Sequence, residues 1–385
     1  MLALRLIRGA HPLVLLRRLL VAAASAGVGF LLLCALTHAL AHPGDSAASL
    51  RRLLWCAVPL AATVHLAVAV ARTDPGTSPR TGLSAVGLGP GRLAVLAAVS
   101  TAVAGALGST VALLFFLHLR GDLTGLPFDG AAAGALAAGR PLPTGATLTL
   151  LALVPLASTL AAALALRPRG APAGPPEPAP APPPPPPGGL PWGCALTTAG
   201  LAVGAYAAAV GRGASVPLPG RLDAHPAGGL AGWALTAVGL AVAGPALTHF
   251  CGRLLQTRRP RAARLLAGRI LMAEARRIGR PLGVVCAVAS AVITAWSLYD
   301  TGPHPFGPLT GLGAVLVIAC TTATLATSAV EARRLRAGAT EDLRRLGAPR
   351  STLRLAALLR VLALLAVLTP VTWAVATLAA VPLNR

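Results

Sequence analysis

Apolar runs separated by short polar segments recur along the whole chain. Each run approaches the length of about 20 residues that a helix needs to cross the hydrocarbon core of a bilayer. About nine such spans are predicted, at residues 19–40, 53–70, 93–117, 146–166, 194–210, 230–250, 282–298, 309–330 and 353–381. We therefore expect an all-α fold, that of a polytopic integral membrane protein.

The most strongly charged break between two runs is the segment 331–354, with the sequence EARRLRAGATEDLRRLGAPRSTLR. Acidic and basic residues are mixed in it, and Gly347 and Pro349 signal a turn ahead of the last apolar run. These features predict a short amphipathic helix that lies against the membrane between two spans. We call this segment the elbow.

A fainter copy of the elbow lies at residues 72–92. Three of its residues correspond to elbow positions: Leu83 to Leu343, Val86 to Leu346 and Gly87 to Gly347. Each copy follows two apolar runs and precedes one. The pattern predicts two related halves, and the copy is a candidate second elbow.

A proline-rich segment at 167–190 separates the two halves. Its run RPRGAPAGPPEPAPAPPPPPPGG disfavours helix and strand and predicts an extended cytoplasmic linker, with a PxxP ligand as the alternative. Before it, residues 1–166 form an N-terminal membrane half of about four spans, a degenerate version of the repeated unit. After it, residues 191–252 hold two linking spans, and residues 253–385 hold three spans and the elbow.

The 33 basic residues are all arginines, and the formal net charge is +22. They gather at the ends of apolar runs, which indicates lipid headgroups rather than nucleic acid as their partner. The densest group, at 253–280, predicts a basic interfacial helix. With a cytoplasmic N-terminus, 25 arginines fall in inside segments and 7 in outside segments. The positive-inside rule therefore predicts a multi-pass protein of the plasma membrane with an extracytoplasmic C-terminus.

Motifs of enzyme chemistry do not occur in the chain. A phosphate-binding loop of the form GxxxxGK[ST] needs a lysine, and the chain has none, so any ATP hydrolysis must come from a partner. The six cysteines stand singly, without metal-ligand spacing. We expect no enzyme activity, no catalytic or metal-binding residue and no cofactor.

Ionisable residues within or beside the spans leave two questions open. Four histidines form either a proton path or ordinary packing and interfacial contacts: His38, His65, His118 and His249. Arg360, about two turns inside the last span, is either an anchor at the cytoplasmic edge or a residue that lines a functional cavity.

The C-terminal part resembles the FtsX-like (MacB/LolC-type) permeases of ABC transporters. The shared pattern is a basic interfacial helix, two spans, an elbow of the form charged-x-Leu-Arg-x-Leu-Gly-Ala and a closing span. The matching elbow residues are Glu341, Asp342, Leu343, Arg344, Arg345, Leu346, Gly347, Ala348 and Pro349. The resemblance covers residues 264–380 well and 5–117 loosely.

In that family the elbow is a coupling helix that docks onto a separate cytoplasmic ATPase. The resemblance thus implies a permease subunit that exports or extracts a hydrophobic or amphipathic substrate, in a homo- or heterodimer. It assigns ATPase coupling to Glu341, Asp342, Leu343, Arg344, Arg345 and Gly347, with Leu83, Val86 and Gly87 in the second elbow. Two alternatives stay open: a membrane sensor or scaffold on a permease-like fold, and a secondary transporter. The large extracytoplasmic domain that is common in the family has no counterpart here, because the loop at 41–52 is short.

Overall fold

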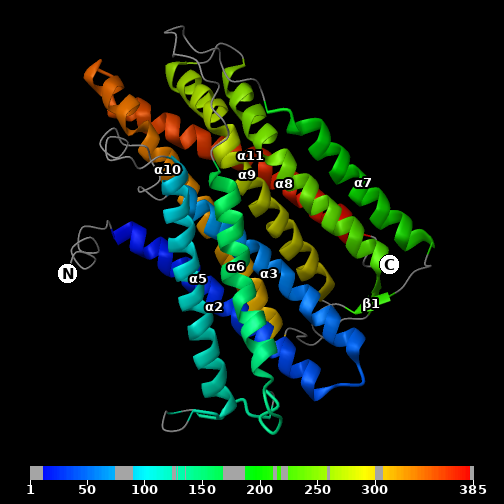
Figure 1. The fold of residues 1–385 in the computed structure, drawn as a ribbon. Helices are drawn as coiled ribbons and strands as arrows, with labels where there is room; N and C mark the ends of the chain where they lie inside the picture. The colour runs from blue at the N-terminus through cyan, green and yellow to red at the C-terminus, as the bar shows by residue number, and fades with distance from the viewer. Residues whose placement is uncertain are drawn as a thin grey trace, which may run out of the picture. The chain divides into compact units, whose positions relative to one another are not determined.

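The computed structural model describes residues 12–73, 90–123, 127, 129–134, 136–167, 187–210, 215–217, 224–257, 261–299 and 307–381. These residues form nine long helices (Figure 1): α2 (Pro12–Ala41), α3 (Ser46–Arg72), α5 (Pro90–Arg120), α6 (Thr144–Leu166), α7 (Gly189–Val210), α8 (Ala227–Gln256), α9 (Ala262–Tyr299), α10 (Pro308–Arg345) and α11 (Arg350–Ala380). A short antiparallel pair of strands, β1 (Ser215–Pro217) and β2 (Ala224–Pro226), stands between α7 and α8. Each of the nine described helices is long and apolar enough to cross a membrane. The prediction of an all-helical polytopic membrane protein is confirmed.

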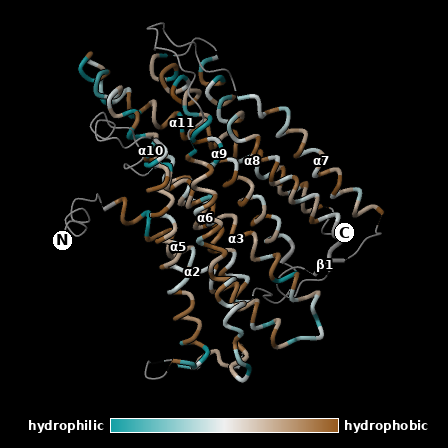
Figure 2. The backbone as a smooth tube through the Cα atoms, in the orientation of Figure 1, coloured by the Kyte–Doolittle hydropathy of each residue, from teal (hydrophilic) through white to brown (hydrophobic). Residues whose placement is uncertain are grey.

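Two of the helices are much longer than a bilayer requires. Helices α9 and α10 have 38 residues each, or about 57 Å at 1.5 Å per residue, whereas the hydrocarbon core is about 30 Å thick. The C-terminal end of α10 is hydrophilic, and hydrophobic residues line the rest of the helix (Figure 2). Both helices therefore continue well past their apolar parts.

This continuity differs from the sequence-based prediction of separate interfacial helices. The elbow residues up to Arg345 are the last turns of α10, and most of the basic segment 253–280 is the first half of α9. The reason is local. Most residues from Glu331 to Arg345 are alanine, leucine, glutamate or arginine, all strong helix formers, and the weaker formers Gly338, Thr340 and Asp342 do not interrupt the helix. The helix therefore ends only at the turn around Gly347.

The chain divides into two units. The N-terminal unit consists of residues 1–175 and 307–327, and the C-terminal unit of residues 176–306 and 328–385. Helix α10 thus begins in the first unit and ends in the second, whereas the sequence analysis grouped the whole of it with the C-terminal part. Packing explains the difference: a Cβ atom on Gly27 of α2 would lie 2.6 Å from Leu316 Cδ2, and the Thr63 hydroxyl of α3 lies 3.7 Å from Cys320 Sγ.

Helix α2 lies at the centre of the N-terminal unit and packs against α3, α5 and α6. Its Leu33 is fully buried in a cluster with Phe116 of α5 and Leu151 of α6. Buried hydroxyls also join neighbouring helices: Ser25 donates to the Gly105 carbonyl at 2.8 Å. In a bilayer such bonds satisfy polar groups that lipid cannot, and they fix the helix positions.

Small residues form the helix contacts of the C-terminal unit. Gly200 and Gly204 of α7 stand four residues apart on the face that meets Gly232 of α8. A Cβ atom on Gly200 would lie 2.6 Å from the Gly232 carbonyl oxygen, closer than side-chain atoms approach one another. The absence of side chains lets the two backbones pack together, as in other GxxxG contacts between membrane helices.

We expect Gly200→Ala to destabilise the protein by about 1–3 kcal/mol, because the added methyl group forces α7 and α8 apart. Gly338→Ala is the matched control: Gly338 is also inside a helix, but a Cβ atom there would meet nothing within 4 Å. The control should be neutral, or stabilising by up to about 1 kcal/mol. Thermal unfolding in detergent measures both. Equal midpoints for the two variants would contradict the packing argument.

Candidate functional site

Helix α10 ends inside the elbow, at a capped turn. Gly347, just after α10, has φ +89°, a left-handed conformation that glycine adopts without strain. The Ala348 N–H donates to the Leu343 carbonyl at 3.0 Å, and the Gly347 N–H to the Arg344 carbonyl at 2.9 Å. This pair of bonds is the Schellman motif, which ends a helix and satisfies its last carbonyls. The chain then reverses into α11, so the turn predicted at Gly347 is present.

The end of α10 presents charges around one apolar side chain. Four predicted coupling residues are exposed: Glu341, Asp342, Arg344 and Arg345. Leu343 is half-buried, and Leu346 at the turn is 85% exposed. Arg344 and Glu341 form a surface ion pair at 3.7 Å. The structure therefore brings the predicted residues of the elbow together on one protruding helix end.

A partly buried ion pair fastens the same half of α10 to α9. Arg336 Nη1 lies 2.9 Å from Glu274 Oε2. The Glu274 side chain is 12% exposed and that of Arg336 is 23% exposed. Water reaches little of either side chain, so each charge would be poorly solvated without its partner. The two charged groups must therefore stay in contact. The pair therefore holds α9 and α10 in register three turns before the elbow turn.

Arg360 of α11 interacts electrostatically with this ion pair. It is half-buried, and its Nε donates to the Ala356 carbonyl of its own helix at 3.3 Å. Glu274 attracts its charge, whereas Arg336 and Arg333 repel it. Three helices thus contribute to one cluster of Glu274, Arg336 and Arg360, which we call the charge cluster. Arg360 is thus half-buried beside other charges, a surrounding that neither interpretation of this residue included.

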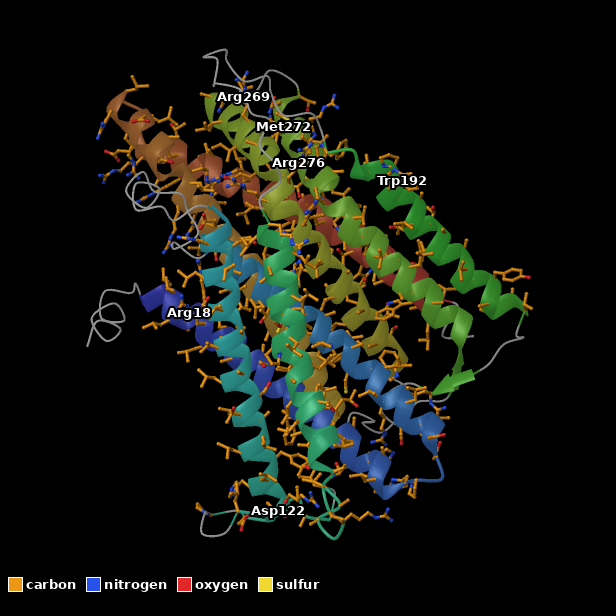
Figure 3. The ribbon with its side chains drawn as sticks, in the orientation of Figure 1. Arg18, Asp122, Trp192, Arg269, Met272 and Arg276 are labelled. Carbon is orange, nitrogen blue, oxygen red and sulfur yellow. The ribbon has the colours of Figure 1, made fainter. Side chains whose placement is uncertain are left out.

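Sequence reasoning did not single out Glu274. A signal was present, because Glu274 is the one acidic residue among the nine arginines of segment 253–280. Figure 3 marks the basic end of α9, with Arg269, Met272 and Arg276 labelled near the start of the helix. A lone carboxylate in so basic a segment indicates an internal ion pair rather than a surface charge.

The remaining predicted site residues fall outside this cluster or outside the described chain. Leu83, Val86 and Gly87 of the second elbow lie outside the described residues, as does most of the proline-rich segment. Among the histidines, the ring of His38 lies 4.4 Å from that of His42, and His118 Nδ1 lies 3.7 Å from Asp129 Oδ1. His38 and His118 belong to the N-terminal unit, whereas His249 belongs to the C-terminal unit. In the described ranges, no group of three or more histidine, cysteine or acidic residues is arranged so that it could hold a metal ion.

No family model, curated protein or solved structure matches the chain. The resemblance to FtsX-like permeases therefore rests on the residues of the elbow and the order of the spans around it.

Proposed function

We propose that this chain is the membrane-spanning permease subunit of an ABC transporter. It couples ATP hydrolysis by a separate cytoplasmic ATPase to the export or extraction of a hydrophobic or amphipathic substrate. One observation carries the proposal: the capped, charged end of α10, with Leu346 exposed at its tip. An exposed apolar side chain ringed by charges has the composition of a protein interface, in which a central apolar anchor is surrounded by polar residues.

Helix α10, which ends at this tip, is suited to transmit a mechanical displacement. Helix α10 is continuous over 38 residues, so a force on its cytoplasmic end moves the transmembrane part of the same rod. The Glu274–Arg336 pair links it to α9, and the short turn at Gly347 links it to α11. Movement of an ATPase against the tip would therefore displace three spans together, and so change the access of a substrate to the membrane unit.

The proposed orientation follows from charge. We place the N-terminus and the elbow in the cytoplasm and the C-terminus outside, because the segments on the elbow side hold 25 of the 33 arginines. Anionic lipids of the cytoplasmic leaflet would hold these arginines, and the bilayer is thus a second partner. The ATPase must be a different chain, because this one lacks the lysine of a phosphate-binding loop.

A sensor or scaffold on the same membrane architecture is the second candidate. The observation that favours it is the short connection between α2 and α3, in which only the residues from His42 to Asp45 separate the helices. Such a loop cannot hold the extracytoplasmic domain that contacts large substrates in the resembled family. Recovery of a kinase or other regulator with the chain, in place of an ATPase, would support this candidate.

Affinity purification in mild detergent tests the proposal. The wild-type chain should retain a cytoplasmic ABC ATPase, and Leu346→Glu should lose it, because a charge replaces the apolar anchor at the tip. Leu335→Glu is the matched control, since Leu335 is also exposed on α10 but lies 11 residues before the tip. Retention by the control and loss by Leu346→Glu is the expected result. Absence of any ATPase from the wild-type preparation would refute the proposal.

A further inference from the structure

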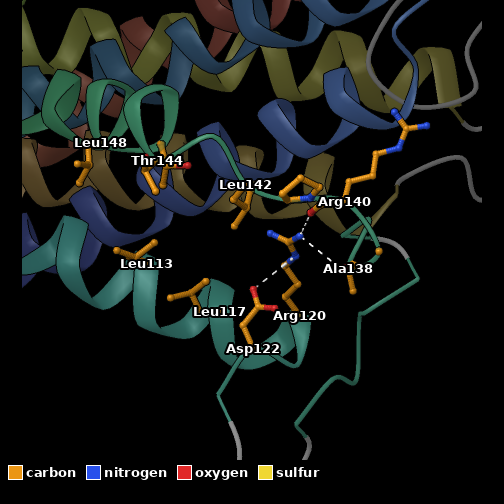
Figure 4. A pocket seen from close by; sticks show the side chains of 12 residues that line it. Leu113, Leu117, Arg120, Asp122, Ala138, Arg140, Leu142, Thr144 and Leu148 are labelled. Carbon is orange, nitrogen blue, oxygen red and sulfur yellow. Dashed lines mark hydrogen bonds and ion pairs between the residues drawn. The ribbon is translucent and has the colours of Figure 1, made fainter.

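We infer that a pocket at the ends of α5 and α6 binds an amphipathic molecule with one hydrocarbon chain and an anionic head. The proposal goes beyond the permease function and does not depend on it. The pocket has a volume of about 540 Å³, within the range of about 300–1,000 Å³ that is usual for small-molecule sites. It belongs entirely to the N-terminal unit, and Figure 4 shows it from close by.

One side of the pocket is apolar. Leu113 and Leu117 stand one turn apart on α5, Leu148 comes from α6, and Leu142 comes from the segment that leads into α6 (Figure 4). Side chains four residues apart lie on the same face of a helix, so the two α5 leucines form a continuous wall. This wall fits a hydrocarbon chain, whose burial is favourable in proportion to the apolar area covered.

The other side holds a buried arginine. Arg120, the last residue of α5, is 4% exposed. Its Nη2 donates to three carbonyls of the loop before α6, those of Ala137, Ala138 and Arg140. Its Nε makes no hydrogen bond and lies 3.5 Å from Asp122 Oδ2. Within the residues that the structure describes, the third nitrogen, Nη1, has no hydrogen-bond partner. The loop thus holds a guanidinium in place and leaves part of its donor capacity unused.

Leaving the buried Nε without a hydrogen bond is costly, so this nitrogen, together with the unpaired Nη1, points to a ligand that accepts hydrogen bonds. Asp122 offsets only part of the positive charge, because Arg140 also stands at this end of the pocket. The Arg140 guanidinium itself extends away and donates to the Leu40 carbonyl of α2. Thr144 also lines the pocket, but it lies beside Leu148, away from Arg120 (Figure 4). A carboxylate or phosphate at the end of a single chain fits this arrangement.

Two sources could supply such a head: a phospholipid of the bilayer or an amphipath from the aqueous phase. They share the chemistry that the pocket recognises, an anion joined to a hydrocarbon chain. Competition separates them. Displacement of a bound probe by lysophosphatidylglycerol, a one-chain phospholipid, in the bilayer identifies a lipid site, and displacement only by added dodecyl phosphate identifies a site for soluble amphipaths. Either result supports the binding chemistry.

Photolabelling of the full chain in phosphatidylcholine nanodiscs tests the inference. The probe is hexadecanoic acid with a diazirine in its chain, and the labelled residues are identified by mass spectrometry. Labels are expected on Leu113, Leu117, Leu142 and Leu148. Leu117→Trp, which fills the pocket, should reduce labelling about tenfold or more. Leu114→Trp is the matched control, because Leu114 is exposed on α5 and does not line the pocket.

A second variant and a second probe keep the test independent of folding defects in Leu117→Trp. Asp122→Asn removes the carboxylate that lies 3.5 Å from Arg120 Nε and should strengthen labelling by the acid roughly threefold to tenfold, because no protein anion then competes for the guanidinium. The uncharged hexadecanol analogue should label the pocket weakly, because it lacks the anion. Labelling that is equal in Leu117→Trp and Leu114→Trp, or equal for acid and alcohol, would overturn the inference, and so would labels spread evenly along α5.

Discussion

Glu274→Gln is expected to destabilise the protein by about 3 kcal/mol, because Arg336 and Arg360 would then share a poorly solvated site without a carboxylate. The ion pair of Glu274 and Arg336 is short, at 2.9 Å, and little exposed. Four free cysteines are buried: Cys34, Cys251, Cys286 and Cys320. A thiol-reactive dye therefore reports unfolding in detergent, and its midpoint should fall clearly in the variant.

Two comparisons isolate the cause. Glu341→Gln also removes one carboxylate from an ion pair, but this pair is exposed at the elbow, so the expected cost is below about 1 kcal/mol. Replacing both partners, as Glu274→Leu with Arg336→Met, should restore part of the stability, because Arg336 is then no longer an unpaired charge and no longer repels Arg360. A midpoint for Glu274→Gln as high as that for Glu341→Gln would contradict the description of the charge cluster as a partly buried, coupled site.

Arg344→Glu with Arg345→Glu is expected to abolish detectable binding of the ATPase, although the chain still inserts in the membrane. Reversing two charges at a docked surface costs about 2–4 kcal/mol, or roughly 30-fold to 1,000-fold in affinity. Both side chains are exposed at the end of α10, so their replacement should leave the unfolding midpoint unchanged. Co-purification measures the association, and membrane extraction with a fusion reporter measures the insertion.

The corresponding positions of the fainter elbow supply the control for this prediction. Ser84 and Ala85 stand where the elbow has Arg344 and Arg345. Ser84→Glu with Ala85→Glu should have little effect on association, because the two residues carry no charge that a partner could recognise. If neither double variant changes association, the arginines of the elbow bind lipid headgroups, and the permease proposal loses its support from individual residues.

The spans could be predicted from the sequence because hydrocarbon imposes a length and a composition on any helix that crosses it. The ends of the helices could not. Hydropathy marks only the part inside lipid, whereas α10 continues through Glu331 and Ala332 because these residues also favour helix. The assignment of the first part of α10 to the N-terminal unit depends on the fit of Leu316 against Gly27, which no local pattern reveals.

The turn in the elbow could be predicted from the sequence, whereas the charge cluster could not. The turn at Gly347 was predictable, because one residue type in a local sequence determines it. The partner of Glu274 was not, because Arg336 lies 62 residues away on another helix. Arg120 is a further case. Its position at the end of a span indicated an outward-facing charge, whereas the structure buries it under the loop before α6.

The division of α10 between two units bears on the order in which the newly made chain folds. A ribosome completes residues 12–167 well before it reaches residues 307–327, which belong to the same unit. Until then, the faces of α2 and α3 that receive Leu316 and Cys320 have no native neighbour. The N-terminal unit can finish folding only after α7, α8 and α9 have been synthesised. A chain interrupted in the proline-rich segment would be left with an incomplete helix bundle, the kind of species that chaperones and proteases recognise.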